Sequence, residues 1–282
     1  MTDRIDAHHH LWKYSATEYG WIGEDMRCLR RDYLPLDLQA EMESAGVQSS
    51  VAVQARQTLE ETRWLLRLAE EYPFIAGVVG WASIASPDFP AHLEALRASP
   101  KLKGLRHVLQ DEPDDAFMLR EDFQRGITAM RDIGLVYDIL IHERHLPYAA
   151  QLADRNPNQI FVLDHLAKPK IRAGELSPWR GHLHQLAQRP NVYCKLSGMV
   201  TEADWNHWAI EDLRPYVEAV LESFGPQRLL AASDWPVCTV AASYERWWKT
   251  LRELIATLSS SEQESILGGN AIEVYRLEGD KP

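Results

Sequence analysis

The chain has 282 residues, of which 45% are hydrophobic and 25% charged, as in ordinary globular proteins. Lys and Arg number 30 against 41 Asp and Glu, and the resulting net charge of −11 argues against nucleic acid as a partner, because phosphate binding needs a basic surface. No apolar run approaches the roughly 18–20 residues of a membrane span, and the 3 cysteines form neither a disulfide framework nor a CxxC motif, so we expect a cytoplasmic protein.

Short apolar runs alternate along the chain with longer helical patterns, which is typical of a parallel sheet built from βα units. The predicted strands are Arg4–His8, Ser50–Gln54, Ile75–Trp81, Leu102–Val108, Leu135–Ile141, Gln159–Asp164, Asn191–Leu196 and Gln227–Ser233. The predicted helices are Leu36–Ala45, Leu59–Glu71, Phe89–Ala98, Asp122–Ile133, Leu146–Arg155, Trp179–Gln188, Asp212–Phe224 and Tyr244–Thr257. This alternation predicts a (β/α)₈ (TIM) barrel as a single domain over residues 1–282. A doubly wound open sheet is disfavoured, because no GxGxxG or GxxxxGK[ST] loop occurs.

An extra helix is expected at the C-terminus. Ser261 and Glu264 have the spacing of a capping box ahead of an apolar stretch. Gly268-Gly269-Asn270 should interrupt the pattern before a last segment, Ala271–Leu277.

Polar side chains gather at the ends of the predicted strands, where barrel enzymes build their active sites. The first strand ends in Asp6-Ala7-His8-His9-His10. The two-residue period of a strand places His8 and His10 on one face, here the barrel interior, and turns His9 away from them. Two imidazoles on one face can hold a metal ion or a substrate oxygen.

Asp234, at the end of the last strand, is the best candidate for a general base, because a carboxylate beside a water molecule can accept its proton. His165, which follows Asp164 at the end of strand six, is a further candidate functional residue. Arg106, at the end of strand four, can bond a carbonyl or another substrate oxygen with its forked guanidinium. The candidates for holding substrate, each against the alternative of plain packing, are Gln54, Trp81, His107, Asp138 and Trp235. Lys168 and Lys195 are expected to neutralise acids of the cleft.

A serine or cysteine nucleophile is not expected, since no GxSxG elbow occurs and no Cys stands beside a His at a strand end.

Several short motifs from the first strand to the end of the chain carry a family resemblance. They are Ile5-Asp6-Ala7-His8-His9-His10-Leu11-Trp12, Tyr19-Gly20-Trp21-Ile22-Gly23, Lys103-Gly104-Leu105-Arg106-His107, Leu163-Asp164-His165-Leu166-Ala167-Lys168-Pro169, Cys194-Lys195-Leu196-Ser197-Gly198, Val200-Thr201-Glu202-Ala203-Asp204-Trp205, Ala232-Ser233-Asp234-Trp235-Pro236 and Gly269-Asn270-Ala271. Together they resemble the amidohydrolase superfamily and, within it, the sugar lactonases of the L-fuconolactonase type.

The resemblance implies that Asp234 activates water while His8, His10 and His165 polarise a lactone carbonyl. If a single divalent ion such as zinc is bound, the same three histidines and Asp234 would hold it. The fourth strand offers Arg106-His107 where binuclear members carry a bridging lysine or glutamate. A two-metal centre is therefore not expected, and no cofactor is expected to be essential.

We therefore expect hydrolysis of a sugar-acid lactone, an aldonolactone similar to L-fuconolactone, to the free acid. A dicarboxylate lactone of the muconolactone or pyrone type would need several arginines, and only Arg106 clearly stands at a strand end. A metal-dependent decarboxylase of the same superfamily and a non-catalytic sugar-binding barrel are the competing interpretations. Only a small-molecule partner is expected, with no nucleic acid or membrane. The sequence leaves open which lactone is used and whether the chain forms a homo-oligomer.

Overall fold

The computed structural model describes residues 3–277, and within this range eight strands form one sheet in the order β1 to β8. They are β1 (Ile5–His9), β2 (Ser49–Val53), β3 (Ile75–Gly80), β4 (Leu102–Val108), β5 (Val136–Leu140), β6 (Phe161–Leu163), β7 (Val192–Leu196) and β8 (Leu229–Ala231). Each strand pairs in parallel with the next. Just beyond β8 the chain meets β1, because the Asp234 N–H donates to the His8 carbonyl at 2.8 Å and the His10 N–H donates to the Trp235 carbonyl at 2.6 Å. The sheet thus closes into a barrel, and the predicted (β/α)₈ fold is confirmed.

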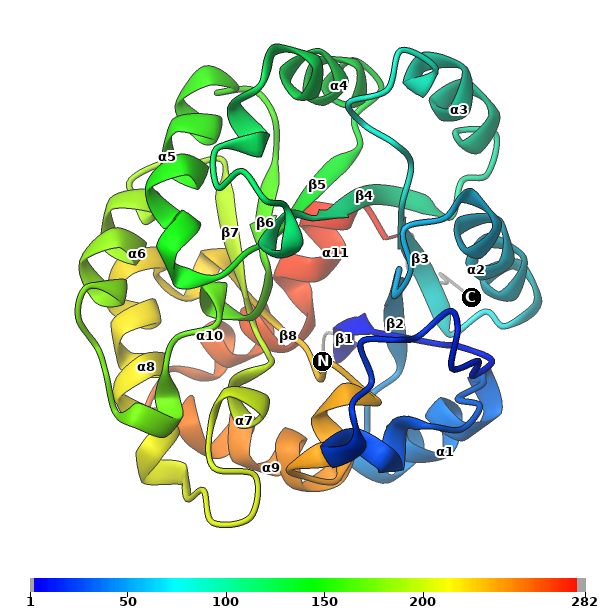
Figure 1. The fold of residues 1–282 in the computed structure, drawn as a ribbon. Coiled ribbons are helices and arrows are strands. Elements are labelled where there is room, and N and C mark those ends of the chain that lie inside the picture. The colour runs from blue at the N-terminus through cyan, green and yellow to red at the C-terminus, as the bar shows by residue number, and fades with distance from the viewer. Residues whose placement is uncertain (1–2, 278–282) are drawn as a thin grey trace.

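Helices surround the strands, and one further helix lies against an end of the barrel (Figure 1). The helices of the described residues are α1 (Pro35–Ala45), α2 (Leu59–Glu71), α3 (Phe89–Leu96), α4 (Glu121–Asp132), α5 (Leu146–Arg155), α6 (Trp179–Ala187), α7 (Met199–Glu202), α8 (Ile210–Phe224), α9 (Tyr244–Leu254), α10 (Ser260–Glu264) and α11 (Asn270–Tyr275). The 3₁₀ turns are η1 (Glu24–Leu29), η2 (Leu109–Asp111), η3 (Phe117–Leu119), η4 (Glu143–His145), η5 (Asp164–Ala167), η6 (Ile171–Ala173), η7 (Pro226–Arg228) and η8 (Val237–Val240). No helix within residues 3–277 has the length and apolar character that crossing a bilayer requires.

The barrel interior is apolar toward the amino ends of the strands. Ile5, Val51 and Val136 pack there with Val274 and Tyr275 of α11, which therefore seals this end of the barrel. The opposite end carries the polar strand exits. This division leaves the carboxyl end of the barrel for the chemistry.

Strand β1 departs from regular alternation just where its polar residues begin. Ile5 and Ala7 belong to the interior cluster, so a strict two-residue period would turn His9 inward next. Instead, the register against β2 shifts between Asp6 and His9, which is the signature of a β-bulge. The bulge brings His8 and His10, rather than His9, to the interior.

The carboxylate of Asp6 stabilises this bulge and joins it to the end of β8. Its Oδ1 accepts hydrogen bonds from the His8 N–H at 3.2 Å and the Ser233 N–H at 2.8 Å. Its Oδ2 accepts from the Ser233 hydroxyl at 2.5 Å and from the Tyr244 hydroxyl at 3.0 Å. The backbone N–H freed by the bulge therefore has a partner, as a buried donor requires.

The C-terminal segment differs from the sequence prediction. The cap of α10 is Ser259, whose hydroxyl accepts from the Glu262 N–H, so the proposed box of Ser261 and Glu264 is wrong. The glycines at 268 and 269 do not break the helix but lie in a π-helical turn, Ser265–Gly269, that leads directly into α11. Gly268 is required there because a Cβ atom would lie 1.9 Å from the carbonyl oxygen of Asp3.

Candidate active site

A cavity of about 550 Å³ opens at the carboxyl end of the barrel. His10, Arg106, His165 and Asp234 line it, each from the end of a different strand. The rest of the lining comes mainly from segments that follow the strands, namely Glu18, Trp21, Ala55, Arg56, Gln57, Thr58, Val108, Gln110, Asp111, Leu140, Lys168 and Val237.

Three imidazoles converge on one carboxylate oxygen at the floor of this cavity. Oδ1 of Asp234 lies 3.3 Å from Nε2 of His10, 3.7 Å from Nε2 of His8 and 3.8 Å from Nε2 of His165. The Nε2 atoms of His8 and His10 are 3.1 Å apart. The structure thus brings together the four residues that the sequence assigns to the chemistry.

Burial and mutual contact set the charge of this cluster. Burial raises the pKa of Asp234, but the interactions with His165 and His10 outweigh it and leave the pKa below its ordinary value. Burial lowers the pKa of His165 to about 4 and that of His8 well below its usual range. At neutral pH the site therefore holds an ionised carboxylate beside neutral imidazoles, which suits a general base.

The partners of the Nδ1 atoms decide what each Nε2 atom can do. Nδ1 of His10 is 2.8 Å from the carbonyl oxygen of Val53 and donates to it, so in the neutral imidazole Nε2 of His10 carries a lone pair. Nδ1 of His165 is 2.9 Å from the Ser197 hydroxyl, which can donate or accept. His165 alone of these two can therefore present an N–H to the cavity.

A buried charge network supports His8 from below. Nδ1 of His8 lies 3.2 Å from Nζ of Lys195 and 3.3 Å from Oδ1 of Asp164. Lys195 also pairs with Asp138 at 2.5 Å and with Asp164 at 3.0 Å, and Arg106 pairs with Asp164 at 3.0 Å. Burial raises the pKa of Asp164, but Lys195, His8 and Arg106 bring it well below its usual range. Two carboxylates and two cations thus balance inside the barrel, which such deep burial requires.

The turn after β6 is left-handed over four consecutive residues. The φ angles of His165, Leu166, Ala167 and Lys168 are 52°, 55°, 59° and 52°. Such a backbone costs about 1–2 kcal/mol per L-residue, so neighbouring groups must hold it. The indole of Trp179 donates to the Leu166 carbonyl at 2.7 Å, and the Ser197 hydroxyl bonds to His165.

Gly198 leaves the space that this turn occupies. Its φ is +68°, and a Cβ atom there would lie 2.7 Å from both Cβ and Cγ of His165. The motif Ser197-Gly198 after β7 is therefore explained by the position of His165. Ser197 forms a hydrogen bond with its imidazole, and Gly198 leaves room for its side chain.

Two overlapping groups of described residues have the donor geometry for one metal ion. They are His8, His10 and Asp234, and His8, Asp164 and His165, with the donor atoms of each group within 4.8 Å of one another. A tetrahedral zinc ion with ligand bonds of about 2.0–2.1 Å needs donor atoms roughly 3.3 Å apart, and the donor atoms of the first group lie 3.1, 3.3 and 3.7 Å from one another. The first group therefore fits a single ion.

The same structure places positive charge beside the shared ligand. NH1 of Arg106 is 3.3 Å from Nε2 of His8, and Nζ of Lys195 is 3.2 Å from its Nδ1. Both cations are buried, so solvent screens them little, and their charge opposes a divalent ion at His8. The site fits a metal, but its affinity should be reduced.

Two of the predicted substrate-binding residues lie beneath the cavity rather than on its surface. Asp138 is fully buried and accepts hydrogen bonds from Lys195 and from the Tyr275 hydroxyl at 2.9 and 3.0 Å. Gln54 is also fully buried, and its carbonyl oxygen and side-chain amide bond to Arg106. Both support the charged floor of the cavity.

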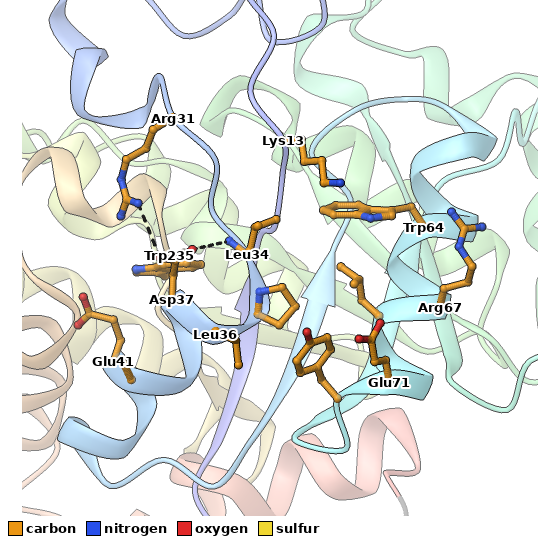
Figure 2. Close-up of a pocket in the computed structure, with 14 residues that line it drawn as sticks. Lys13, Arg31, Leu34, Leu36, Asp37, Glu41, Trp64, Arg67, Glu71 and Trp235 are labelled. Atoms are coloured by element: carbon orange, nitrogen blue, oxygen red, sulfur yellow. Dashed lines mark hydrogen bonds and ion pairs between the residues drawn. The ribbon is translucent and has the colours of Figure 1, made fainter.

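Three further predicted residues point elsewhere. The Trp81 indole donates to His107 at 3.3 Å, and His107 turns to Glu112 at 2.6 Å, so the pair lies beside the cavity lining rather than within it. Figure 2 shows Trp235 in a separate hollow of about 730 Å³ between α1 and α2, where it shares the wall with Leu34 and Trp64. This larger hollow contains none of the histidines of the Asp234 cluster.

The residues that the sequence did not assign come mainly from loops. Arg56 and Gln57 follow β2, Gln110 follows β4, and Glu18 and Trp21 come from the segment between β1 and α1. Trp21 lies in one of the resemblance motifs, which is the signal that the sequence offers for it. In the structure 46% of its surface is exposed, although it is a large aromatic residue.

A closed (β/α)₈ barrel with a histidine–aspartate centre at its carboxyl end is the architecture of a barrel enzyme. The sequence profile of the amidohydrolase family matches residues 5–277. The chain belongs to this family, as the resemblance predicted.

The chain is similar to two proteins that are named L-fucono-1,5-lactonase. The one from Burkholderia multivorans is 42% identical over 291 residues, covering 97% of this chain and 96% of that protein. The one from Burkholderia ambifaria is 38% identical over 286 residues, covering 100% and 98%. A crystal structure of an amidohydrolase from Burkholderia multivorans with bound zinc superposes with a TM-score of 0.95, at 42% identity, covering 98% of this chain and all of that one. The predicted enzyme class, a hydrolase, is confirmed.

His9 provides a test of the bulge in β1. It is fully buried, neither of its ring nitrogens has a hydrogen-bond partner among the described residues, and burial lowers its pKa to about 3. His9→Leu removes an unpaired polar group and should change turnover less than threefold and the free energy of unfolding by less than about 1 kcal/mol. His8→Ala and His10→Ala should lower turnover at least about a hundredfold. Turnover assays and urea unfolding decide this, and a large loss of turnover in His9→Leu at unchanged stability would show that the register of β1 is wrong.

Gly198 provides a test of the left-handed turn, with Gly174 as a matched control. Their φ angles are +68° and +66°, but a Cβ atom at 174 meets nothing within 4 Å. Gly174→Ala should therefore cost only about 1 kcal/mol of stability, the price of the backbone conformation. Gly198→Ala should cost more and also lower turnover at least about tenfold, because His165 must move. Equal effects of the two variants on both quantities would mean that Gly198 does not position His165.

Proposed function

We propose that this protein hydrolyses the lactone of a sugar acid, an aldonolactone similar to L-fuconolactone, to the free acid. The observation that carries the proposal is the ionised Asp234 among neutral imidazoles at the floor of an open cavity, in a chain 38–42% identical to proteins named L-fucono-1,5-lactonase.

In the proposed reaction Asp234 accepts a proton from water as the water oxygen attacks the lactone carbonyl. His165 donates from Nε2 to the oxygen that becomes negatively charged, because the Ser197 hydroxyl can donate to its Nδ1. His10 presents a lone pair and, with His8, orients the water at Asp234. These roles use the three histidines differently, according to the partner of each Nδ1 atom.

A single divalent ion, if bound, would be held by His8, His10 and Asp234, with His165 beside them, and would supply Lewis-acid polarisation of the carbonyl. The cations next to His8 favour an enzyme that does not depend on this ion. Asp164 can accept the Nδ1 proton of His8 when its Nε2 acts as a ligand.

The charges of the cavity favour a polyol over a dicarboxylate substrate. Two of the cations that line it are already paired within the described residues, Arg56 with Glu18 and Arg106 with Asp164. Only Lys168 remains for a substrate carboxylate, whereas a dicarboxylate lactone would need at least two such groups. Hydroxyl groups can instead bond to Gln57, Gln110 and Asp111.

Asp234→Asn tests the general base. Asn tolerates the left-handed backbone at this position, where φ is 59°, so the variant should fold normally. Turnover of an aldonolactone, followed with a pH indicator, should fall at least about a hundredfold. Asp132→Asn, at the exposed end of α4, is the control and should behave as the wild type. Nearly full turnover in Asp234→Asn would remove Asp234 from the mechanism.

Chelation tests the dependence on metal. After prolonged dialysis against a strong chelator, we expect more than about half of the lactonase activity to remain, because Arg106 and Lys195 already supply positive charge at His8. Metal content should be measured on the same samples. Loss of activity that zinc restores would contradict this prediction and favour a metal-dependent reaction, decarboxylation included.

A further inference from the structure

Lys168 lines the catalytic cavity without a partner for its charge. Within residues 3–277 its ammonium group forms no ion pair or side-chain hydrogen bond, and the side chain is only half-buried. Its charge nonetheless reaches the reacting centre. Burial raises the pKa of Asp234, and Lys168 is one of the neighbours that together bring it below its ordinary value. Burial also raises the pKa of Glu202, which does not line the cavity, and Lys168 opposes that rise.

The left-handed turn of η5 is what brings Lys168 to the cavity. In a helical turn of about 3.6 residues, positions i and i+3 lie on the same face, whichever the hand. His165 and Lys168 have this spacing, and both line the cavity, whereas Leu166 and Ala167 are completely buried. The strained turn therefore presents a neutral imidazole and an ammonium group to the same cavity.

Apart from Asp234, which carries a proton only after it has deprotonated water, the remaining polar groups of the cavity floor are not suited to deliver a proton to a leaving group. His10 donates its Nδ1 proton to Val53 and shows a lone pair at Nε2. Arg106 is held by Asp164 and by the Gln54 carbonyl, and a guanidinium does not give up its proton in proteins. The proposed role of His165 directs its N–H to the carbonyl oxygen. Ring opening still requires a proton for the ring oxygen, because an aliphatic alkoxide is a poor leaving group.

We propose, resting on the proposed lactonase function, that Lys168 is a catalytic residue that protonates the leaving ring oxygen. Asp234 takes a proton from water as the new O–C bond forms. The ring C–O bond then breaks, and the ring oxygen leaves with its electron pair and takes a proton from Nζ of Lys168. The proton on Asp234 returns to the Lys168 amine through solvent in the open cavity. The sum of these steps is one water molecule added to one lactone, giving the hydroxy acid.

The test compares Lys168→Met, Lys168→Arg and Lys168→Ala on an aliphatic sugar δ-lactone. Lys168→Met and Lys168→Arg should each lower kcat at least about a hundredfold with little change in KM, since arginine keeps the charge but does not release a proton. Lys168→Ala should regain activity with added propylammonium but not with tetramethylammonium, which has charge and no proton to give. Lys170→Met is the matched control. It removes an exposed lysine two residues away that pairs with Glu143 and Glu175, and it should turn over the lactone as the wild type does.

Three outcomes would overturn the inference: kcat within threefold of the wild type in Lys168→Met, full activity in Lys168→Arg, or equal rescue by the two ammonium ions. The rescue experiment separates catalysis from folding, because a merely structural role of Lys168 would not respond to a small amine. If the wild type opens the lactone and the Lys168 variants do so equally well, only this inference fails. If the wild type opens no aldonolactone, the proposed function fails and this inference fails with it.

Discussion

The hydrogen bonds of the buried Asp6 carboxylate are the interaction on which the site depends. Burial raises the pKa of this group to about 6, although its bonds to Ser233, His8 and Tyr244 oppose the rise. By accepting the His8 N–H it stabilises the bulge of β1, and by binding Ser233 it holds the end of β8 against that bulge. The barrel closes here through Asp234 and His8, so one carboxylate fixes the inward direction of the histidines and their distance from Asp234. Tyr244 ties the same group to α9, in the outer layer.

A second constraint follows from placing so many charges inside a barrel. Asp138, Asp164, Arg106 and Lys195 are nearly or completely buried, and each would be costly without the others. Because Lys195 and Arg106 both face His8, the network does more than neutralise itself. It places positive charge beside the candidate metal ligand His8, while Asp164 remains as a partner for the imidazole. The site thus has donor atoms at the spacing that an ion needs, but the positive charges of Arg106 and Lys195 oppose its binding. Tyr275 extends the network to α11, so the helix that seals the amino end also supports the floor of the active site.

The strands and the residues that meet at Asp234 could be predicted from the sequence, because both depend on local patterns. Runs of apolar residues indicate the eight strands, and polar strand ends indicate His8, His10, His165 and Asp234. Alternation from the interior residues Ile5 and Ala7 would turn His9 inward, so the inward direction of His8 and His10 needs the bulge, which depends on Asp6 meeting a residue more than two hundred positions away. Trp81, His107 and Trp235 lie at or near the carboxyl ends of strands, but a residue there can turn to either side. Nothing local favours left-handed conformations at Leu166 and Ala167, which only Trp179, Ser197 and Gly198 make acceptable.

Strained backbone lies at the strand exits around the cavity, whereas the paired charges lie beneath it. The non-glycine residues with left-handed backbone are, apart from Arg276 among those described, Asp234 and the four residues from His165 to Lys168, all at the strand exits around the cavity. The charged groups beneath them are paired with one another. The strained segments are held by hydrogen bonds with neighbouring elements, namely with Trp179 and Ser197 for the turn after β6 and with the His8 carbonyl for Asp234. Lys168 is the exception to pairing, and it lies at the end of the strained segment. An unpaired ammonium costs little in an open cavity, where water solvates it, and the proposed proton transfer would use it once a substrate displaces that water. The fold thus pairs the charges beneath the cavity and leaves the charge of Lys168, which lines it, without an ion pair among the described residues.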